Sequence, residues 1–412
     1  MKIHTYYKIV LKNVSPLSVG SGRNEFSDHD CIRHNNGNPY IPASSIAGVF
    51  RHYFDGNKSL QNDIFGTIED KSLKSNVIFY DAEVSGKSVF SIRDSVKLKN
   101  KVVDGDAKFD MEVVETGSEF ITYIETDGNN YDKQQYIEEV LSALRNGSIR
   151  FGTKTSRGYG MIDIVSIKKA EFNIDNPEQL DKWLDFDIFS SSGWDSTEEY
   201  EQESYTGKFI NIRLRLNQRG AISIRTYTTD TSGYDEGKAP DYKHMTLKSG
   251  EPVITGTSWA GAFRERYTEF AGEDAADMLF GYVKKAKDND DKTITQCSHI
   301  KFSESVISDS IMKNITRNSI DRFNAGTKDS ALYTGIACYN GKTELSIIIP
   351  DNLTDKEKMY LGAVMYDLGQ GYLSVGGLTT VGHGIFSAES ISVNGIDKTD
   401  CFTPEKLADL WR

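Results

Sequence analysis

A tandem internal repeat is the feature of this 412-residue sequence that most limits its fold. Residues 37–54 (GNPYIPASSIAGVFRHYF) align without a gap with residues 250–267 (GEPVITGTSWAGAFRERY), and eight of the eighteen positions are identical. Further matches follow in the same order: Phe65-Gly66 with Phe280-Gly281, 75–84 with 298–307, Arg93 onward with Arg317 onward, and 147–162 with 371–386. Because similarity in one order along most of a chain indicates duplication, we expect two copies of one fold in series.

Each copy carries the same order of expected elements. In the first, a strand over 6–14 precedes a helix that Ser44 or Ser45 caps, which runs to about Phe54. Strand regions over 76–84 and 110–126, a helix over 132–147 and a strand over 159–167 follow. In the second copy, Thr354 and Glu357 form a capping box at the start of the corresponding late helix. The order βαββαβ is typical of an α+β, ferredoxin-like (RRM-like) sheet, so we predict two such domains in tandem.

The negative charge of the chain is concentrated between the two copies. Residues 171–206 contain 11 acidic residues and one lysine, and so account for most of the net charge of -12. We therefore predict a first repeat over 1–169, an acidic linker over 170–206 and a second repeat over 207–412. The nearly neutral repeats are free to carry basic surfaces that attract a polyanion.

Cysteine spacing and hydropathy exclude several other classes of protein. The four cysteines are far apart and form no C-x-x-C pair, which argues against a thiolate zinc site and a disulfide framework. The N-terminal sequence lacks the apolar run of a signal peptide, and no stretch of about 18 apolar residues could span a membrane. We expect a cytoplasmic protein with no membrane partner.

Two glycine-rich loops are the most specific local motifs. One contains Gly152, Gly158 and Gly160, and the other contains Gly376, Gly377, Gly382 and Gly384. Neither matches a phosphate-binding P-loop or a dinucleotide-binding fingerprint, because no G-K-[ST] follows and the next expected element is a strand. The first loop carries three basic residues that suit a polyanion, Arg150, Lys154 and Arg157. The alternative is a purely structural loop that packs the helices.

In combination, these motifs resemble the RAMP superfamily of CRISPR effector proteins. The resemblance rests on the short first strand, the acidic loop, the motif over 37–51 and 250–264, the Phe-Gly pairs and the glycine-rich loops. It is greatest to the backbone subunits of type III effector complexes, here with two repeats fused in one chain. The resemblance implies a subunit of an antiviral defence complex that lies along a CRISPR guide RNA. Its partners would be the guide RNA, the target RNA and other backbone, small and large effector subunits.

The resemblance also suggests where RNA is bound. A helix N-terminus offers unpaired N–H groups to a phosphate, which makes Ser44, Ser45 and the matching Thr257 and Ser258 candidates. Arg51 and Arg264 occupy matching places further along these helices. A basic hairpin thumb would bend the guide–target duplex, and it would carry Arg93, Lys97, Lys99, Lys108 and Phe109 in the first copy and Arg317, Arg322, Phe323 and Lys328 in the second. For each basic residue, a solvated or salt-bridged surface is the alternative.

The loop before each motif could carry catalysis. In target-cleaving members of the family an aspartate on this loop is needed to cut the paired RNA. Asp28 lies nine residues before Gly37, and Asp241 lies nine residues before Gly250. The resemblance thus implies that both are catalytic and that both bind Mg²⁺ or another divalent cation. Asp30 competes with Asp28, and His29, His34 and His244 are candidate general bases.

Several functions remain open at this stage. The first is a metal-dependent endoribonuclease that cuts guide-paired target RNA at regular intervals. The second is a non-catalytic RNA-binding scaffold or capping subunit of the same complex. A guide-processing endonuclease and a duplicated ferredoxin-like protein that binds no RNA are further alternatives.

Overall fold

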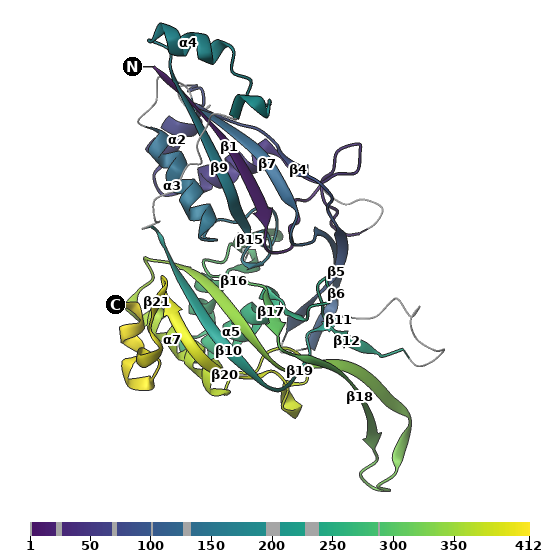
Figure 1. The fold of residues 1–412 in the computed structure, drawn as a ribbon. Helices are drawn as coiled ribbons and strands as arrows, with labels where there is room; N and C mark the ends of the chain where they lie inside the picture. The colour runs from purple at the N-terminus through teal and green to yellow at the C-terminus, as the bar shows by residue number, and fades with distance from the viewer. Residues whose placement is uncertain are drawn as a thin grey trace. The chain divides into compact units, whose positions relative to one another are not determined.

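The chain has a mixed α+β fold and divides into two compact units (Figure 1). The structure is a computed structural model that describes residues 2–21, 27–67, 72–99, 102–126, 133–194, 207–226, 239–286 and 289–412, without the side chains of 95–99, 102–108, 285–286, 289–292 and 330. The first unit comprises Met1–Thr155 and Tyr159–Gly207, and the second comprises Ser156–Gly158 and Lys208–Arg412. The two units have matching sheets, as the internal repeat requires.

The first unit is built on one antiparallel sheet. Its elements are β1 (Ile3–Asn13), β2 (Tyr40–Ile41), α1 (Ala43–Tyr53), α2 (Lys58–Phe65), β3 (Val77–Phe79), β4 (Ala82–Ser85), β5 (Phe90–Lys99), β6 (Val102–Val114), β7 (Glu119–Thr126), α3 (Gln134–Arg145), β9 (Ile162–Asn173) and α4 (Pro177–Leu184). The strand order is β2-β4-β7-β1-β9, and β3 also pairs with β7. Strand β1 thus lies between β7 and β9.

The second unit repeats this arrangement in a larger sheet. Its elements are β8 (Arg157–Gly158), β10 (Phe209–Ile222), β11 (Arg225–Thr226), β12 (Tyr242–His244), β13 (Val253–Ile254), α5 (Gly256–Ala271), α6 (Glu273–Phe280), β14 (Tyr282–Ala286), β15 (Asn289–Gln296), β16 (Lys301–Ser303), β17 (Ser305–Ser308), β18 (Ile311–Ile320), β19 (Thr327–Pro350), α7 (Asp355–Gln370), β20 (Ile385–Val393) and β21 (Ile396–Asp397). Strand β10 lies between β19 and β20, and β16, β17 and β18 all pair with β19. The capping box of Thr354 and Glu357 is confirmed at the start of α7.

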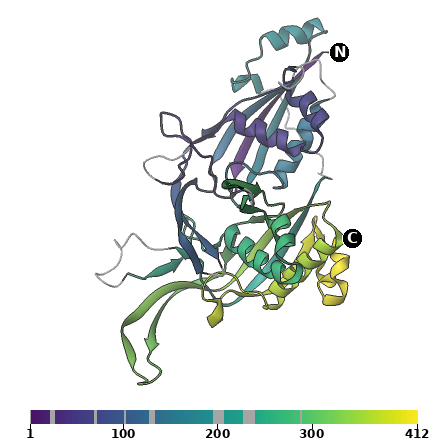
Figure 2. The same ribbon diagram turned by 180° about the vertical axis from the view of Figure 1, so that it is seen from behind.

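Helices cover one face of the sheet in each unit, as Figure 2 shows from behind. Alternation along the strands explains this arrangement, because every second side chain points to the helix side. In β7, Phe120, Thr122, Ile124 and Thr126 are buried, whereas the residues between them are half-buried. In the second unit Trp259 and Phe263 of α5 belong to one large apolar core with Leu345 and Ile347 of β19.

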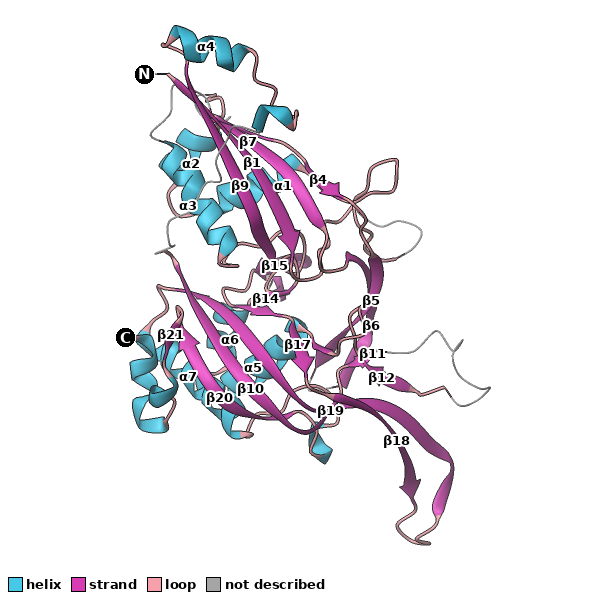
Figure 3. Ribbon diagram, in the orientation of Figure 1, coloured by secondary structure: helices cyan, strands magenta, loops and turns pink. Residues whose placement is uncertain are grey.

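A long two-stranded hairpin extends from each sheet (Figure 3). In the first unit it consists of β5 and β6, and in the second of β18 and the first part of β19. At the tip of the second hairpin, the Asp321 carboxylate accepts hydrogen bonds from the N–H groups of Phe323 (2.8 Å) and Asn324 (3.1 Å). This local turn holds the Phe323 side chain in solvent, where it is 98% exposed.

The segment that we expected to be an acidic linker is partly folded onto the first unit. Of residues 170–206, the described part continues β9 and forms α4 and a short 3₁₀ turn at Ser192–Trp194. Trp194 is fully buried in a cluster with Tyr6 and Ala170. The Trp183 indole N–H also donates to the Tyr6 hydroxyl at 2.8 Å. The aromatic side chains of this acidic segment thus cover the face of the sheet that lies opposite helices α1 and α3. The acidic composition of the segment gave no sign of this packing.

The glycine-rich loops have a structural role in both units. A Cβ atom at Gly160 would lie 1.8 Å from the Phe151 carbonyl oxygen, and one at Gly384 would lie 1.9 Å from that of Val375. Both glycines also have positive φ angles, 71° and 76°. The structural alternative therefore accounts for these two positions, because no other residue fits there.

The described residues contain no helix that is long and apolar enough to cross a membrane. All four cysteines are free.

Candidate nucleic-acid interface and catalytic loops

The two candidate catalytic aspartates are anchored in the same way in both units. The Asp28 carboxylate accepts a hydrogen bond from the N–H of Asp110 on β6 at 3.2 Å. The Asp241 carboxylate accepts one from the N–H of Thr334 on β19 at 2.8 Å. Asp110 and Thr334 are equivalent, because both follow the offset of 224 that relates Arg93 to Arg317. Each aspartate therefore lies at the base of its hairpin, at one repeated position.

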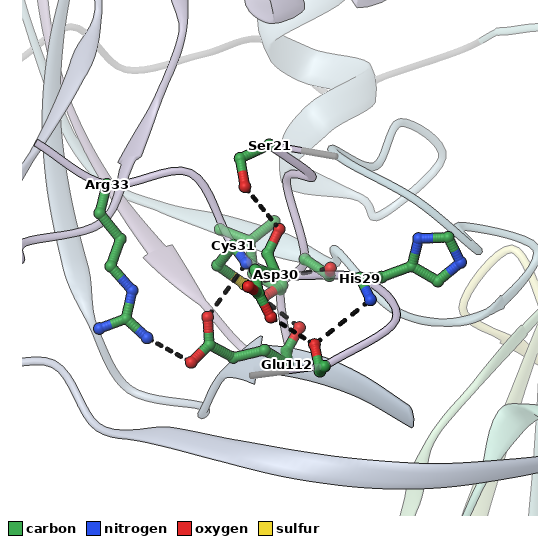
Figure 4. Close-up of polar contacts among 9 residues, drawn as sticks. Ser21, His29, Asp30, Cys31, Arg33 and Glu112 are labelled. Atoms are coloured by element: carbon green, nitrogen blue, oxygen red, sulfur yellow. Dashed lines mark hydrogen bonds and ion pairs between the residues drawn. The ribbon is translucent and has the colours of Figure 1, made fainter. Parts of the chain in front are cut away.

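Glu112 holds the loop that carries Asp28 against the hairpin (Figure 4). Its N–H donates to the His29 carbonyl at 2.9 Å, and its carboxylate accepts from the Cys31 N–H at 3.0 Å. The same carboxylate forms an ion pair with Arg33. Sequence reasoning missed Glu112, because contacts between residues some 80 positions apart leave no local pattern.

Three motifs that are distant in sequence meet beside Asp28. Lys154 of the glycine-rich loop lies over the Phe109 ring of the hairpin, with Nζ 3.8 Å from the ring centroid. His29 contacts the same ring edge to face, at 6.4 Å between centroids. A loop carboxylate, a cation and an aromatic ring thus lie together at the base of the hairpin, with the Nζ atom of Lys154 buried.

A different set of residues occupies the matching place in the second unit. Arg317 of β18 lies 2.9 Å from the Nε2 atom of His383, which belongs to the second glycine-rich loop. Burial, and then the charges of Arg317 and Arg225, lower the pKa of His383. The Arg225 guanidinium lies over the Tyr242 ring at 4.5 Å. A lowered histidine pKa keeps the imidazole neutral. Among the residues that the structure describes, neither Arg317 nor Arg225 forms an ion pair.

Arg51 and Arg264, predicted to bind phosphate, instead close the helix pairs of the two units. Arg51 donates to the Gly66 carbonyl and to the Asn62 side chain, both at 3.1 Å. Arg264 donates to the Gly281 carbonyl at 2.6 Å and pairs with Asp277, which matches Asn62. The Phe-Gly pairs thus supply a carbonyl for a repeated structural arginine. A phosphate would have to compete with these partners, so the predicted RNA contacts of Arg51 and Arg264 stay a prediction.

The helix N-termini also differ from the prediction. Pro42, and not Ser44 or Ser45, is the N-cap of α1, and the Asp81 carboxylate accepts the Ala43 N–H at 2.6 Å. In the second unit Thr255 caps α5 and hydrogen-bonds to the hydroxyls of Thr257 and Ser258, both at 2.9 Å. A carboxylate already occupies the first site, so a phosphate would have to displace it.

Two more basic candidates lie in the interior of the first unit. Arg93 is 4% exposed and forms an ion pair with Glu115 at 3.5 Å. Arg150 is 4% exposed and donates to the Thr155 carbonyl at 2.9 Å, and burial lowers its pKa to about 10. Both guanidinium groups are buried and paired with protein groups, so either would have to become exposed to contact RNA, and their role as RNA ligands stays a prediction. The side chains of Lys97 and Lys99 lie outside the described residues.

The remaining basic candidates lie at the surface. Arg157 is exposed, and Arg322, Phe323 and Lys328 are exposed on the second hairpin. An exposed aromatic ring with flanking cations suits a nucleic-acid duplex or strand, because bases stack on the ring while cations pair with phosphates.

His244 and Asp30 are structural residues rather than candidate catalysts. Asp30 is 4% exposed and accepts a hydrogen bond from the Ser27 hydroxyl. His244 is fully buried, and its Nδ1 accepts the Ile224 N–H at 3.1 Å. Burial lowers the pKa of His244 to about 4. His34 is stacked on Tyr40 and contacts Glu83 at 2.9 Å, so of the three histidines only His29 lies beside a candidate aspartate.

The buried His244 predicts a loss of stability in mild acid. Its pKa is about 4 when folded and about 6.5 when unfolded, so the unfolded state binds the proton first. The free energy of unfolding should therefore fall by up to about 3 kcal/mol between pH 6.5 and pH 4 through this residue alone. In His244→Asn the side-chain oxygen can still accept the Ile224 N–H but does not titrate. Denaturant unfolding from pH 7 to pH 4 should show a shallower loss in this variant, and equal slopes would contradict the assignment.

No cluster of three or more His, Cys, Asp or Glu side chains that could hold a metal occurs among the described residues. A divalent cation at Asp28 or Asp241 would therefore take most of its ligands from phosphate oxygens and water. Such a site fits Mg²⁺, which keeps several waters and often binds through one or two carboxylates.

Comparison with known proteins identifies the family. The sequence profile of the RAMP superfamily matches residues 10–163 and 231–387, which together make up more than half of the chain. The chain therefore belongs to the RAMP superfamily and contains two RAMP regions, as the internal repeat predicted. No curated protein matches it.

Among solved structures, one chain of the cryo-EM structure of the type III-B Cmr-beta bound to cognate target RNA is similar. The identity is 14% and the TM-score is 0.32, over 45% of this chain and 61% of that chain. This chain thus matches less than two thirds of that structure's chain.

Proposed function

We propose that this chain is a CRISPR RNA-binding backbone subunit of a type III effector complex, which cleaves target RNA at Asp28 and Asp241. Each unit would be a ferredoxin-like βαββαβ domain, which the strand orders β9-β1-β7-β4 and β20-β10-β19-β16 support. Its partners would be the guide RNA, the target RNA and other subunits of the complex. Membership of the RAMP superfamily supports this class of function.

The observation that carries the proposal is the repeated placement of the two aspartates. Two loops of different length bring a carboxylate to the same backbone N–H at the base of a hairpin. A turn-forming aspartate would bond within its own loop, whereas these two reach a strand some 80 or more residues away. Two equivalent carboxylates in two tandem units would act on an RNA duplex at two regularly spaced positions.

The chemistry that such a site supports is cleavage by the RNA itself. The target 2′-hydroxyl gives its proton to a base and its oxygen attacks the adjacent phosphorus, so the 2′-O–P bond forms. The bond from phosphorus to the 5′ oxygen breaks, and that oxygen takes a proton from water. A carboxylate fixed through one oxygen can accept the hydroxyl proton with its other oxygen. A bound divalent cation would supply charge neutralisation at the phosphate. The hairpin would hold the duplex open beside the loop, so that the attacking and leaving oxygens align.

A non-catalytic scaffold remains the second candidate. The observation that favours it is that no cluster of three potential metal ligands occurs in the described parts of either unit. In that case the aspartates would only fix the loops, and another subunit would cut the RNA.

The hairpin of the second unit provides the binding test. Phe323→Ala should weaken binding to a guide–target duplex about 5- to 100-fold, because one stacked base is lost. Arg322→Gln with Lys328→Gln should reduce the slope of log affinity against log salt by roughly 1.5 to 2, since two phosphate contacts disappear. Both effects can be measured by fluorescence anisotropy over a series of salt concentrations.

Matched controls lie elsewhere in the second unit. Tyr372 is 72% exposed and Lys406 is also exposed, and neither is on the hairpin. Tyr372→Ala and Lys406→Gln should leave RNA affinity and its salt slope unchanged. Equal losses in the control and hairpin variants, or no salt-dependent RNA affinity of the unaltered protein, would count against the proposed function.

A further inference from the structure

A tripeptide of the first glycine-rich loop forms an added strand in the second unit. Ser156–Gly158 belongs to that unit, and β8 pairs in parallel with β16, Arg157 opposite Phe302 and Gly158 opposite Ser303. The Phe302 N–H donates to the Ser156 carbonyl at 3.1 Å. This tripeptide therefore extends the sheet at the edge of β16, beside the first turn of α5.

The fit at this edge requires glycine on both sides. A Cβ atom at Gly256 would lie 2.4 Å from the Arg157 carbonyl oxygen, and one at Gly158 would lie 3.0 Å from the Glu304 nitrogen and 3.1 Å from Gly256. Residues beside the added strand are shielded from solvent, since Gly256 is buried and Phe302 is fully buried. Gly256 is thus a specific acceptor for a glycine-rich strand.

The first unit has the same edge without an added strand. Its β3 matches β16, and within the described strands β3 pairs with β7 alone. Phe79, the counterpart of Phe302, is only half-buried. The Tyr80 N–H donates to Tyr123 on β7 at 3.1 Å, so alternation directs the Phe79 N–H away from β7 and toward the open edge.

Two residues close this edge to an identical strand. Ala43 replaces Gly256, so its methyl group occupies the place that the Arg157 carbonyl approaches in the second unit. In addition, the Asp81 carboxylate binds the Ala43 N–H at 2.6 Å. Among the described strands, the first unit therefore has an unpaired edge at β3, which matches the edge of β16 that β8 occupies in the second unit. Ala43 and Asp81 leave no room there for a strand like Ser156–Gly158.

The second unit, in turn, has its own copy of the tripeptide. Thr380–Gly382 matches Ser156–Gly158, and all three residues are exposed, Val381 by 59%. The segment forms part of a 3₁₀ turn that ends at Gly382, with a φ of 85°. Gly382 preserves the backbone freedom that Gly158 uses at a φ of 100°, and nothing lies within 4 Å of a Cβ atom there.

We propose that Thr380–Gly382 docks as an added strand on a RAMP repeat of another chain, and that this repeat has glycine at the position of Gly256. Ala43 closes the first unit of this chain to such a strand. The chain then joins a row of repeats through its second unit only, and its first unit ends the row. This inference rests on the proposed function, because only a subunit of a larger complex needs such a partner.

The test supplies an acceptor of known sequence, a second copy of the chain. The unaltered protein should sediment as a single chain, because its own acceptor is closed. Ala43→Gly should self-associate head to tail, roughly tenfold or more tightly than the unaltered protein, with larger species as concentration rises. Adding Gly382→Val should restore the single chain. Adding Gly395→Val should not, because Gly395 has a similar φ of 79° but lies away from the loop.

Three results would overturn the proposal. The first is an Ala43→Gly protein that stays a single chain at the highest concentration. The second is self-association that Gly382→Val does not weaken. The third is self-association of the unaltered protein that Gly382→Val abolishes, which would mean that the first unit is open. The sedimentation assay contains no RNA, so a failure of the proposed RNA function would appear in the binding assay and not here.

Discussion

Asp28→Ala should remove one of two cuts in a guide-paired target RNA, and Asp241→Ala should remove the other. Each carboxylate stands at the base of its own hairpin, held by the Asp110 or the Thr334 N–H. Loss of a group that assists proton transfer in the transition state lowers a rate about 100- to 10,000-fold. Each variant should therefore lose its own product band and keep the band of the other site.

The measurement is denaturing electrophoresis of end-labelled target RNA, cut by the assembled complex with Mg²⁺. Asp28→Asn and Asp241→Asn remove the negative charge but keep the loop in place, because an amide oxygen still accepts the backbone N–H. They should lose cleavage while the Tm of the protein stays near that of the unaltered chain. Asp400→Asn, in a short turn near the C-terminus, is the control and should cut normally. Two unchanged cuts in all variants would leave the scaffold function as the remaining candidate.

Gly160→Ala and Gly384→Ala should each unfold the unit that carries the residue. The added methyl group would lie 1.8 or 1.9 Å from a carbonyl oxygen, at a positive φ. The backbone cannot move away, because hydrogen bonds hold both glycines on two sides. Their carbonyls accept from the Phe151 and Val375 N–H groups at 2.9 Å, and their N–H groups donate to the Pro16 and Ala221 carbonyls at 2.8 and 2.7 Å. We expect a loss of more than about 4 kcal/mol of unfolding free energy in each case, which belongs to the most damaging class of substitution.

Gly117 and Gly395 are the matched controls for this prediction. Both have positive φ angles, 96° and 79°, and a Cβ atom at either would have nothing within 4 Å. Gly117→Ala and Gly395→Ala should therefore cost only the conformational strain, about 1 kcal/mol. Soluble yield, thermal melting and denaturant unfolding will compare the four variants. Similar losses at all four positions would show that backbone conformation, and not close approach, explains the glycine-rich loops.

The sequence predicted those features that depend on local pattern or on self-comparison. Duplication placed Asp28 opposite Asp241, and the capping box placed the start of α7 at the correct residue. Hydrophobic periodicity predicted the principal helices and strands of the first unit, because burial on one face leaves a local signature, but it did not predict α2, α4 or β5. The sequence could not predict the anchoring of the two aspartates, which depends on strands far away in the chain.

The predicted RNA ligands show the limit of composition. Arg322, Phe323 and Lys328 are exposed, whereas Arg93 and Arg150 are buried. All the arginines look alike in a sequence, because a guanidinium can pair equally with a phosphate, a carboxylate or a carbonyl. Arg51 and Arg264 bind the carbonyls of Gly66 and Gly281, a choice that only packing could settle.

By itself, the sequence thus determined the duplicated α+β architecture, the equivalence of the two aspartates and the family. Periodicity and repetition carry this information, and both can be recognised from the order of residues along the chain. Only the tertiary structure decided which charges are paired, that aromatic residues fold part of the acidic segment onto the first sheet, and that Ser156–Gly158 belongs to the second unit. Those outcomes depend on desolvation and on close approach between distant segments, which have no counterpart in a local pattern.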